Sequence, residues 1–254
     1  MGVSINVLLA FMIIVSFLLA IPLHEFGHAT MARWLGDRTP QAEGRQSLGL
    51  RSHIDPVGLL MCVILAFQPI LAYPVGFGWG KPVKADPWKM KVGANLGLFT
   101  VAIAGPLFSL IIGLLVALIV RFTGISLLLL HNPYAERLLQ LLIVFASVNI
   151  CLALFNLIPL YPLDGYQIVY TLLPSKQAVQ FAKSAPYGPF IILALFFFLP
   201  FLARLSGLGS FPLFQLAYYI LAGSLNIITL VVGPFVAPGS YSDLLAYVTR
   251  YYFL

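Results

Sequence analysis

The stretch IIVSFLLAIPLHEFGHATMARW, residues 13–34, places three acidic or imidazole side chains inside an apolar run. The three are His24, Glu25 and His28, and the run extends back to Ser4 with Pro22 as its helix breaker. An ionisable group inside a lipid bilayer is costly and is functional by default. The stretch therefore predicts one long membrane helix, residues 4–34, that carries a functional site.

The spacing of these three residues is HExxH. Residues four apart lie on one face of a helix, so the imidazoles of His24 and His28 can reach one metal ion. Glu25 is rotated by about 100° from His24, which suits a base that acts on a metal-bound water. The alternative is a pair of structural histidines with Glu25 as their hydrogen-bond partner, which spends three costly groups on stability alone.

The composition excludes several classes of protein. The 254 residues are 61% hydrophobic and 9% charged, whereas soluble domains have about 45–50% apolar and about 25% charged residues. Soluble globular and disordered chains are both excluded. The net charge of +6 indicates basic loops on one side of a membrane. The sequence has no basic run interleaved with aromatic residues, which would be the sign of nucleic-acid binding.

We predict an all-α polytopic membrane protein with about five transmembrane helices, a re-entrant segment and a short extended or β-like element near 76–84. Residues 1–173 would form a catalytic membrane core, and residues 174–254 would form two C-terminal transmembrane helices. The parts of the core are the HExxH helix 4–34, the re-entrant region 56–90, helices 92–120 and 137–158, and the Asp-Gly segment 159–166.

Two features support the re-entrant region. Gln68-Pro69 interrupts the apolar run that follows Asp55-Pro56, which itself offers an N-cap and a first-turn proline. The glycine-rich segment 76–84 is not helical in character. It is either a tight connection or an unpaired edge to which an unwound peptide could add as a strand.

Two histidines leave a catalytic zinc one protein ligand short. Asp164 is the other acid at the end of an apolar span, and two prolines and a glycine interrupt the helix around it. The carboxylate can therefore turn inward. An N-cap role for Asp164 is the alternative, and it is compatible with metal ligation.

The chain resembles the site-2 protease family of intramembrane zinc metalloproteases over most of residues 10–170. The resemblance is closest to compact bacterial members without a PDZ or CBS domain. It rests on HEFGH at 24–28, Asn156…Pro159…Leu163-Asp164-Gly165, Gly105-Pro106, and the supporting segments 53–58 and 78–83.

The resemblance implies one Zn²⁺ per chain, held by His24, His28 and Asp164. It implies that Glu25 is the catalytic acid and base and that Asn156 holds the substrate or the tetrahedral intermediate.

Three further residues are weaker candidates for supporting roles: His53, Ser109 and Asn149. Tyr161 stands where the family usually has proline, and Ser109 where many relatives have asparagine, so pocket shape and substrate preference should differ.

The expected function is hydrolysis of a peptide bond in a transmembrane substrate, within or near the bilayer of the cell membrane. Two alternatives remain. One is an inactive relative that binds membrane helices without cutting them. The other is a transporter with a His/Glu/Asp relay, which would favour paired half-helices and internal symmetry that the sequence lacks.

Charge counting predicts the topology. If residues 57–77 return to the side they left, eleven of the fourteen Lys and Arg residues share one side; if they cross fully, the division is seven to seven. The positive-inside rule favours the first arrangement. The N-terminus would then be exterior, the C-terminus cytoplasmic, and the zinc site towards the cytoplasmic side.

Single cysteines at positions 46 and 86 test this topology. We expect a membrane-impermeant thiol reagent to label both from the cytoplasmic face, because the re-entrant segment between them does not cross. Labelling of the two positions from opposite faces would contradict the re-entrant arrangement.

Overall fold

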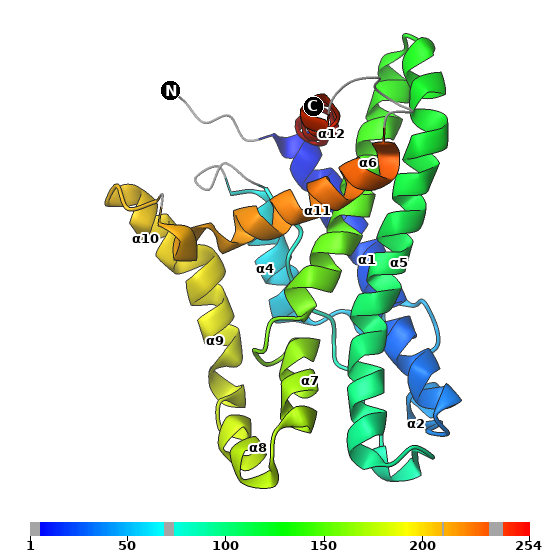
Figure 1. Cartoon of the computed structure of the whole chain (residues 1–254), viewed down its shortest axis with the longest axis vertical. Coiled ribbons are helices and arrows are strands. Elements are labelled where there is room, and N and C mark those ends of the chain that lie inside the picture. The colour runs from blue at the N-terminus through cyan, green and yellow to red at the C-terminus, as the bar shows by residue number, and fades with distance from the viewer. Residues whose placement is uncertain (1–5, 69–73, 210, 234–240) are drawn as a thin grey trace.

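The computed structural model describes residues 6–68, 74–209, 211–233 and 241–254 (Figure 1). All regular elements in these ranges are helical, and their one β-type pairing is an isolated antiparallel bridge between Ile54 and Gly80. The predicted all-α fold is therefore confirmed. The expected β-like element near 76–84 reduces to that single bridge within an otherwise irregular segment.

Five helical stretches are long and apolar enough to cross a membrane, which confirms the predicted number and suggests a multi-pass membrane protein. They are α1 (Val7–Trp34), α5 (Ala94–Leu129), α6 (Pro133–Asn156), the composite Ser175–Leu205, and Pro212–Val232. The composite contains α8 (Ser175–Ala182), η2 (Ala185–Tyr187), α9 (Gly188–Leu193), the π-helical η3 (Ala194–Phe198) and α10 (Leu199–Leu205). The last stretch joins η4 (Pro212–Gln215) to α11 (Leu216–Val232).

The remaining elements are short. They are α2 (Thr39–Ala42), α3 (Leu50–His53), α4 (Pro56–Ala66), η1 (Pro87–Lys89), α7 (Asp164–Leu172) and α12 (Tyr241–Phe253). Asp55 caps α4 by accepting hydrogen bonds from the N–H groups of Val57 and Gly58, as the Asp55-Pro56 pair predicts. Asn132 caps α6 in the same way through Tyr134, so α6 begins before residue 137.

The helix that was expected to end at Val120 continues to Leu129. No proline interrupts residues 121–129, and the one charged residue among them, Arg121, donates a hydrogen bond of 2.9 Å to the carbonyl of Val231 in α11. With its charge partnered by a neighbouring helix, Arg121 does not end α5.

Helices α1, α5 and α6 form the centre of the molecule (Figure 1). Small residues let their backbones approach. A methyl group on Gly27 of α1 would lie 3.0 Å from the carbonyl of Ala104 in α5, and one on Gly113 of α5 would lie 3.0 Å from the carbonyl of Ala146 in α6. This close packing holds the HExxH helix against α5.

Helix α4, with 11 residues, is too short to cross a membrane. The chain leaves at Ile54 and returns at Gly80, which bridges Ile54, and the N–H of Lys81 donates to the carbonyl of His53 at 2.7 Å. The described residues 56–68 and 74–79 thus belong to an arm whose two ends lie together, as a re-entrant segment requires. Pro69 of the predicted Gln68-Pro69 turn lies outside the described residues.

The C-terminal part differs from the sequence expectation. Helix α11 runs obliquely across α5 and α6, and α12 lies at the end of the molecule where α1 begins (Figure 1). Helix α12 has 13 residues, buries Val248 and Tyr252, and accepts a hydrogen bond of 3.4 Å from Gln140 at the carbonyl of Tyr252. Because α12 lies at the end where α1 begins, Arg250 and the C-terminus lie away from the basic loop that follows α1, which differs from the predicted topology.

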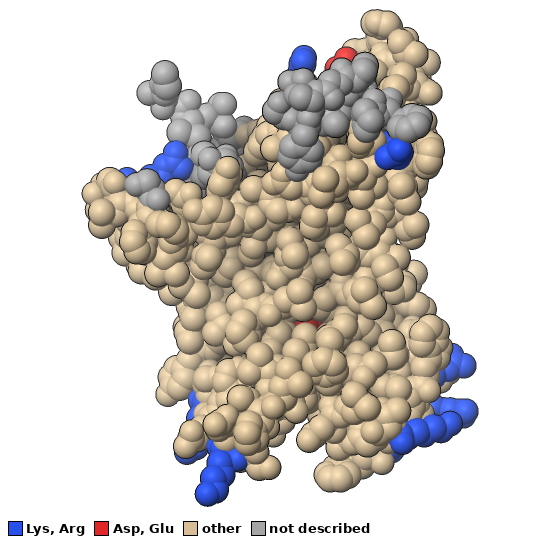
Figure 2. Space-filling model, in the orientation of Figure 1, with Lys and Arg blue, Asp and Glu red and all other residues tan. Residues whose placement is uncertain are grey.

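The charged side chains lie mainly at the two ends of the face shown in Figure 2. Lys and Arg gather at its lower end, near α2 and α8, and fewer lie at its upper end. A broad band between them is almost free of charge. This is the surface that a helical membrane protein presents to lipid.

The arm generates a stability prediction at Gly58. A methyl group there would collide with the backbone carbonyl of Trp79, so Gly58→Ala should separate α4 from the returning chain. We expect a loss of about 1–3 kcal/mol in unfolding free energy, measured by thermal or denaturant unfolding in detergent micelles. Gly49→Ala is the control, since the nearest atom to its added methyl is 3.6 Å away. Equal stability of the two variants would contradict this packing.

Candidate metal centre

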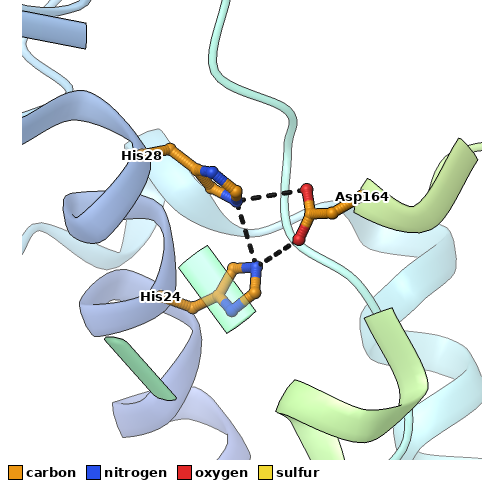
Figure 3. A group of neighbouring side chains, drawn as sticks. All are labelled: His24, His28 and Asp164. Carbon is orange, nitrogen blue, oxygen red and sulfur yellow. Dashed lines mark hydrogen bonds and ion pairs between the residues drawn. The ribbon is translucent and has the colours of Figure 1, made fainter. Parts of the chain in front are cut away.

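Three side chains converge at the end of α1 nearer Trp34 and the start of α7 (Figure 3). The Nε2 atom of His24 lies 3.0 Å from Oδ2 of Asp164, and the Nε2 atom of His28 lies 3.1 Å from Oδ1 of the same carboxylate. The two Nε2 atoms are 3.2 Å apart. All three potential ligand atoms lie within 4.8 Å of one another. In the described part of the chain, this is the group of His, Cys, Asp and Glu that could hold a metal ion.

The outer nitrogen of each imidazole has its own partner. The Nδ1 atom of His28 donates to the carbonyl of Val101 at 2.7 Å, and Nδ1 of His24 lies 2.9 Å from the hydroxyl of Ser109. A histidine that donates from Nδ1 keeps the lone pair of Nε2 for a metal, and this arrangement is typical of metal-binding histidines. Helix α5 therefore orients both rings.

The donor set fits zinc. Two imidazole nitrogens and one carboxylate are the three protein ligands of a catalytic zinc site, which keeps its fourth position open. The space also fits, because Gly105 of α5 faces the histidines. A methyl group on Gly105 would collide with Nε2 of His28 and would lie 2.8 Å from Nε2 of His24.

The local sequence turns Asp164 inward. Residues 157–163 leave α6 in tight turns, with Leu160 N–H to Ile158 carbonyl and Leu163 N–H to Leu160 carbonyl bonds of 2.8 Å each. Gly165 then packs against the carbonyl of Leu157, where a side chain would collide. The N-cap of α7 is Leu163, so the alternative of Asp164 as the capping residue is not what the structure shows.

Glu25 lies beside the cluster but outside it. The side chain is buried, and its Oε1 atom packs against the Cα of Gly80 so closely that a methyl group there would collide. Its Oε2 atom has no hydrogen-bond partner among the described residues. A buried polar atom without a partner is uncommon, and this one is available to a water molecule or a substrate.

A cavity of about 500 Å³ contains these groups. Its walls come from α1, α5, α7, the end of α6 and the returning arm. The residues beyond the four already named include Trp79, Gly80, Pro82, Val83, Lys84, Asn156, Tyr161, Tyr166, Gln167 and Tyr170.

The tyrosines of the cavity were not predicted as a group. Tyr161 and Tyr166 make an edge-on ring contact with centroids 5.6 Å apart, and Tyr166 stacks on Phe181 of α8 at 4.7 Å. Tyr166 and Tyr170 are four residues apart on α7, and this spacing in the sequence predicts that they share one helix face. Tyr161, which stands where the family usually has proline, lines the cavity, so this departure from the family pattern affects the shape of the pocket.

Of the three supporting candidates and Asn156, two lie at the site and two lie away from it. Ser109 contacts His24, and Asn156 lines the cavity while its amide donates to the carbonyl of Leu152 at 2.9 Å. Asn149 is buried away from the cavity and donates to its own helix at Phe145.

His53 also lies outside the cavity, at the end of α3. Its Nε2 atom is 2.6 Å from the carbonyl of Ser47. Burial lowers the pKa of His53, so the ring is neutral near pH 7 and Nε2–H donates to that carbonyl.

The comparisons with known proteins point in one direction. The chain is 30% identical over 212 residues to "Putative zinc metalloprotease YwhC" of Bacillus subtilis, covering 80% of this chain and 84% of that protein. It is 27% identical over 188 residues to "Putative zinc metalloprotease Rip2" of Mycobacterium tuberculosis, covering 73% and 66% of the two chains.

A shorter match, 36% identical over 80 residues, is to "Zinc metalloprotease MJ0392" of Methanocaldococcus jannaschii. It covers 32% of this chain and 21% of that protein. No protein-family profile and no solved structure matches the chain. The names of the three relatives support a metalloprotease and imply zinc.

The match to YwhC extends over most of both proteins, and the residues of the HExxH and Asp-Gly motifs meet in one centre. The chain belongs to the site-2 protease family of zinc metalloproteases.

Proposed function

We propose that this protein is an intramembrane zinc endopeptidase that hydrolyses a peptide bond of a membrane-spanning substrate within or near the bilayer. The observation that carries the proposal is the meeting of His24, His28 and Asp164 beside the unpartnered carboxylate of Glu25. These groups lie in a cavity among helices that are apolar enough to span a membrane.

His24, His28 and Asp164 would hold the metal. When bound, zinc supplies a Lewis acid that polarises the scissile carbonyl and makes water a nucleophile at neutral pH. The carbonyl of Val101 and the hydroxyl of Ser109 keep both imidazoles in place for this role.

Glu25 would act as the general base and then as the general acid. Its carboxylate accepts a proton from the attacking water and then delivers it to the amine of the leaving peptide. Asn156 uses one N–H on Leu152, and an amide nitrogen has two hydrogens. The second can donate to the carbonyl oxygen of the substrate as negative charge develops there.

The substrate would have to unwind. In a helix each carbonyl accepts the N–H four residues later, so the scissile carbonyl is hidden until the helix opens. The irregular segment that returns from the arm, residues 80–85, lines the cavity. Its backbone would lie beside an unwound peptide.

We further propose that the protein resides in the cell membrane with its metal centre towards the cytoplasm. His24 is about 26 Å along α1 from Val7 at 1.5 Å per residue, so it lies nearer the end that carries Arg33 in its last turn and leads into the segment with Arg38 and Arg45. Basic loops remain on the cytoplasmic side. The partners would be lipid and a transmembrane substrate, with no nucleic acid.

Two substitutions separate the proposed base from a proposed ligand. Glu25→Gln should keep zinc and lose cleavage by at least about a hundredfold, because the amide cannot accept the proton. Asp164→Asn should lose zinc affinity by about a hundredfold or more, because a charged ligand is removed. Metal analysis of the purified protein and cleavage of a labelled single-span peptide measure the two effects.

Glu43→Gln is the control, since Glu43 is an exposed acid in the loop after α2. Equal zinc in wild type and Asp164→Asn would remove Asp164 from the ligands. Undiminished cleavage by Glu25→Gln would remove Glu25 from the reaction. Loss of cleavage in Glu25→Gln with zinc retained would dispose of both a transporter and an inactive helix-binding protein.

The need for unwinding makes a separate prediction about substrates. A glycine or proline placed near the scissile bond of a single-span peptide should raise kcat/KM by about tenfold, since each destabilises a helix by about 1–3 kcal/mol. Replacing such residues with leucine should lower it. Rates that respond to neither change would show that unwinding does not limit cleavage.

A further inference from the structure

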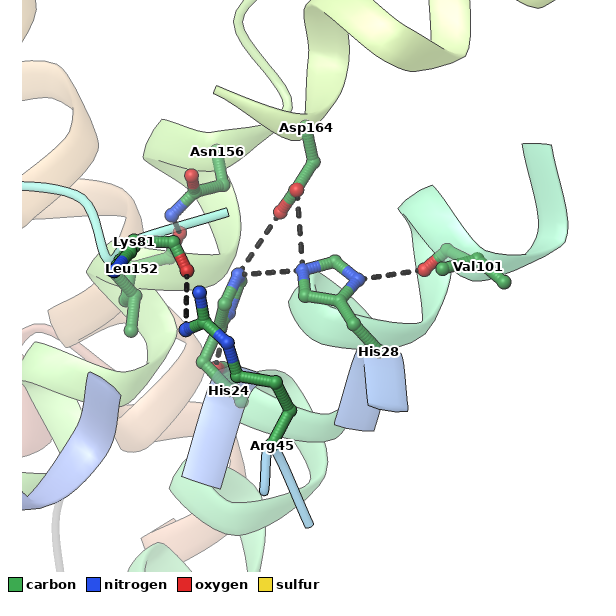
Figure 4. Close-up of polar contacts among 9 residues, drawn as sticks. His24, His28, Arg45, Lys81, Val101, Leu152, Asn156 and Asp164 are labelled. Atoms are coloured by element: carbon green, nitrogen blue, oxygen red, sulfur yellow. Dashed lines mark hydrogen bonds and ion pairs between the residues drawn. The ribbon is translucent and has the colours of Figure 1, made fainter. Parts of the chain in front are cut away.

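Arg45 is a buried arginine in the loop between α2 and α3, with 4% of its surface exposed. Its guanidinium donates to three backbone carbonyls: those of Ser52, of Lys81 at 3.1 Å (Figure 4) and of Pro82 at 3.4 Å. Among the described residues, no carboxylate lies within ion-pair distance of it. A buried charge without an ion-pair partner is costly, so the carbonyls that it binds call for an explanation.

These carbonyls belong to two different segments. Ser52 is in α3, directly after the loop that holds Arg45, whereas Lys81 and Pro82 are in the chain that returns from the arm. Pro82 lines the cavity, and Gly80 both lines it and packs against Oε1 of Glu25. Arg45 therefore fastens one wall of the cavity, at the point closest to the proposed base, to a loop outside the cavity.

The other bonds that hold this wall lie at its ends. The N–H of Lys81 binds the carbonyl of His53 at 2.7 Å, and the N–H of Asp86 binds the carboxylate of Asp37 at 2.7 Å. Pro82 has no N–H of its own. Between these two hydrogen bonds, the described backbone of the wall is bonded to a neighbouring segment through the carbonyls of Lys81 and Pro82, and both accept from Arg45.

We infer that Arg45 is a positioning residue for the substrate: its guanidinium sets the backbone of residues 80–83 against the cavity, so that the wall meets an unwound peptide beside Glu25. The inference rests on the proposed function for its consequence in catalysis. Its structural content, that Arg45 holds this wall, stands independently of any substrate.

Trp79 reports the wall directly. The chain has three tryptophans, and Trp79 is 5% exposed at the cavity, whereas Trp34 and Trp88 are 73% and 87% exposed. In a Trp34→Phe, Trp88→Phe background, Arg45→Met should shift the emission of Trp79 to longer wavelength and increase its quenching by acrylamide. Methionine keeps the apolar stem of the side chain and removes its five donors.

Kinetics with a labelled single-span peptide carrying a central Gly-Pro separate positioning from general damage. Arg45→Met should raise KM by about tenfold, as expected for lost hydrogen bonds to a charged donor, with kcat within about twofold and zinc content unchanged. Arg45→Lys should give a smaller change in both KM and Trp79 emission, because lysine keeps the charge and a donor without the planar fork.

Arg51→Met is the matched control, because Arg51 is an exposed arginine close by in the sequence, in α3. Trp79 emission and KM in Arg45→Met that equal those of Arg51→Met would overturn the inference. So would a parallel fall in kcat and zinc content at unchanged KM, which marks damage to the fold. Failure of the wild type to cut the peptide would count against the proposed function, and Trp79 emission would still decide the role of Arg45.

Discussion

The burial of ionisable groups inside an apolar helix is the constraint on which the rest of this structure depends. His24, Glu25 and His28 are each less than 5% exposed in the middle of α1's buried face. Polar groups removed from water must find partners within the protein. In this fold Asp164, 140 residues away in the sequence, contacts the imidazoles, and a carbonyl and a hydroxyl of α5 bind their other nitrogens. Of these four side chains, Glu25 is the one with a buried oxygen that has no partner among the described residues, and it lines the cavity.

The same constraint explains where glycine is needed. Three elements must approach one small volume, and each does so through a residue without a side chain. Gly27 lets α1 meet α5, Gly105 leaves room for both imidazoles, and Gly80 lets the returning arm touch Glu25. A larger residue at any of these positions would displace a backbone from the site. Close packing in the centre therefore sets the geometry of the site as well as the stability of the fold.

Short-range patterns in the sequence predict much of this. The HExxH spacing places two histidines on one helix face, the prolines around Asp164 indicate a broken helix, and the Asp55-Pro56 pair marks the start of α4. What could not be predicted depends on contacts between distant segments. Helix α12 is short and amphipathic, and its position follows from packing on α6 and α11. Arg45 cannot be distinguished in the sequence from Arg38 or Arg51, because its burial arises only when residue 81 returns to the loop.

The return of the arm also gives the cavity two kinds of wall. On one side lie regular helices, whose backbone groups are already bonded within each helix. On the other lies the irregular segment 80–86, whose bonds are made to the backbone of His53 and to the side chains of Arg45 and Asp37. Between its ends a helix has no free backbone groups to offer a peptide, whereas an irregular segment can have them. The proposed cleavage of an unwound chain would use the wall of the second kind, and side chains from outside the cavity hold that wall. These side chains are Arg45 and Asp37.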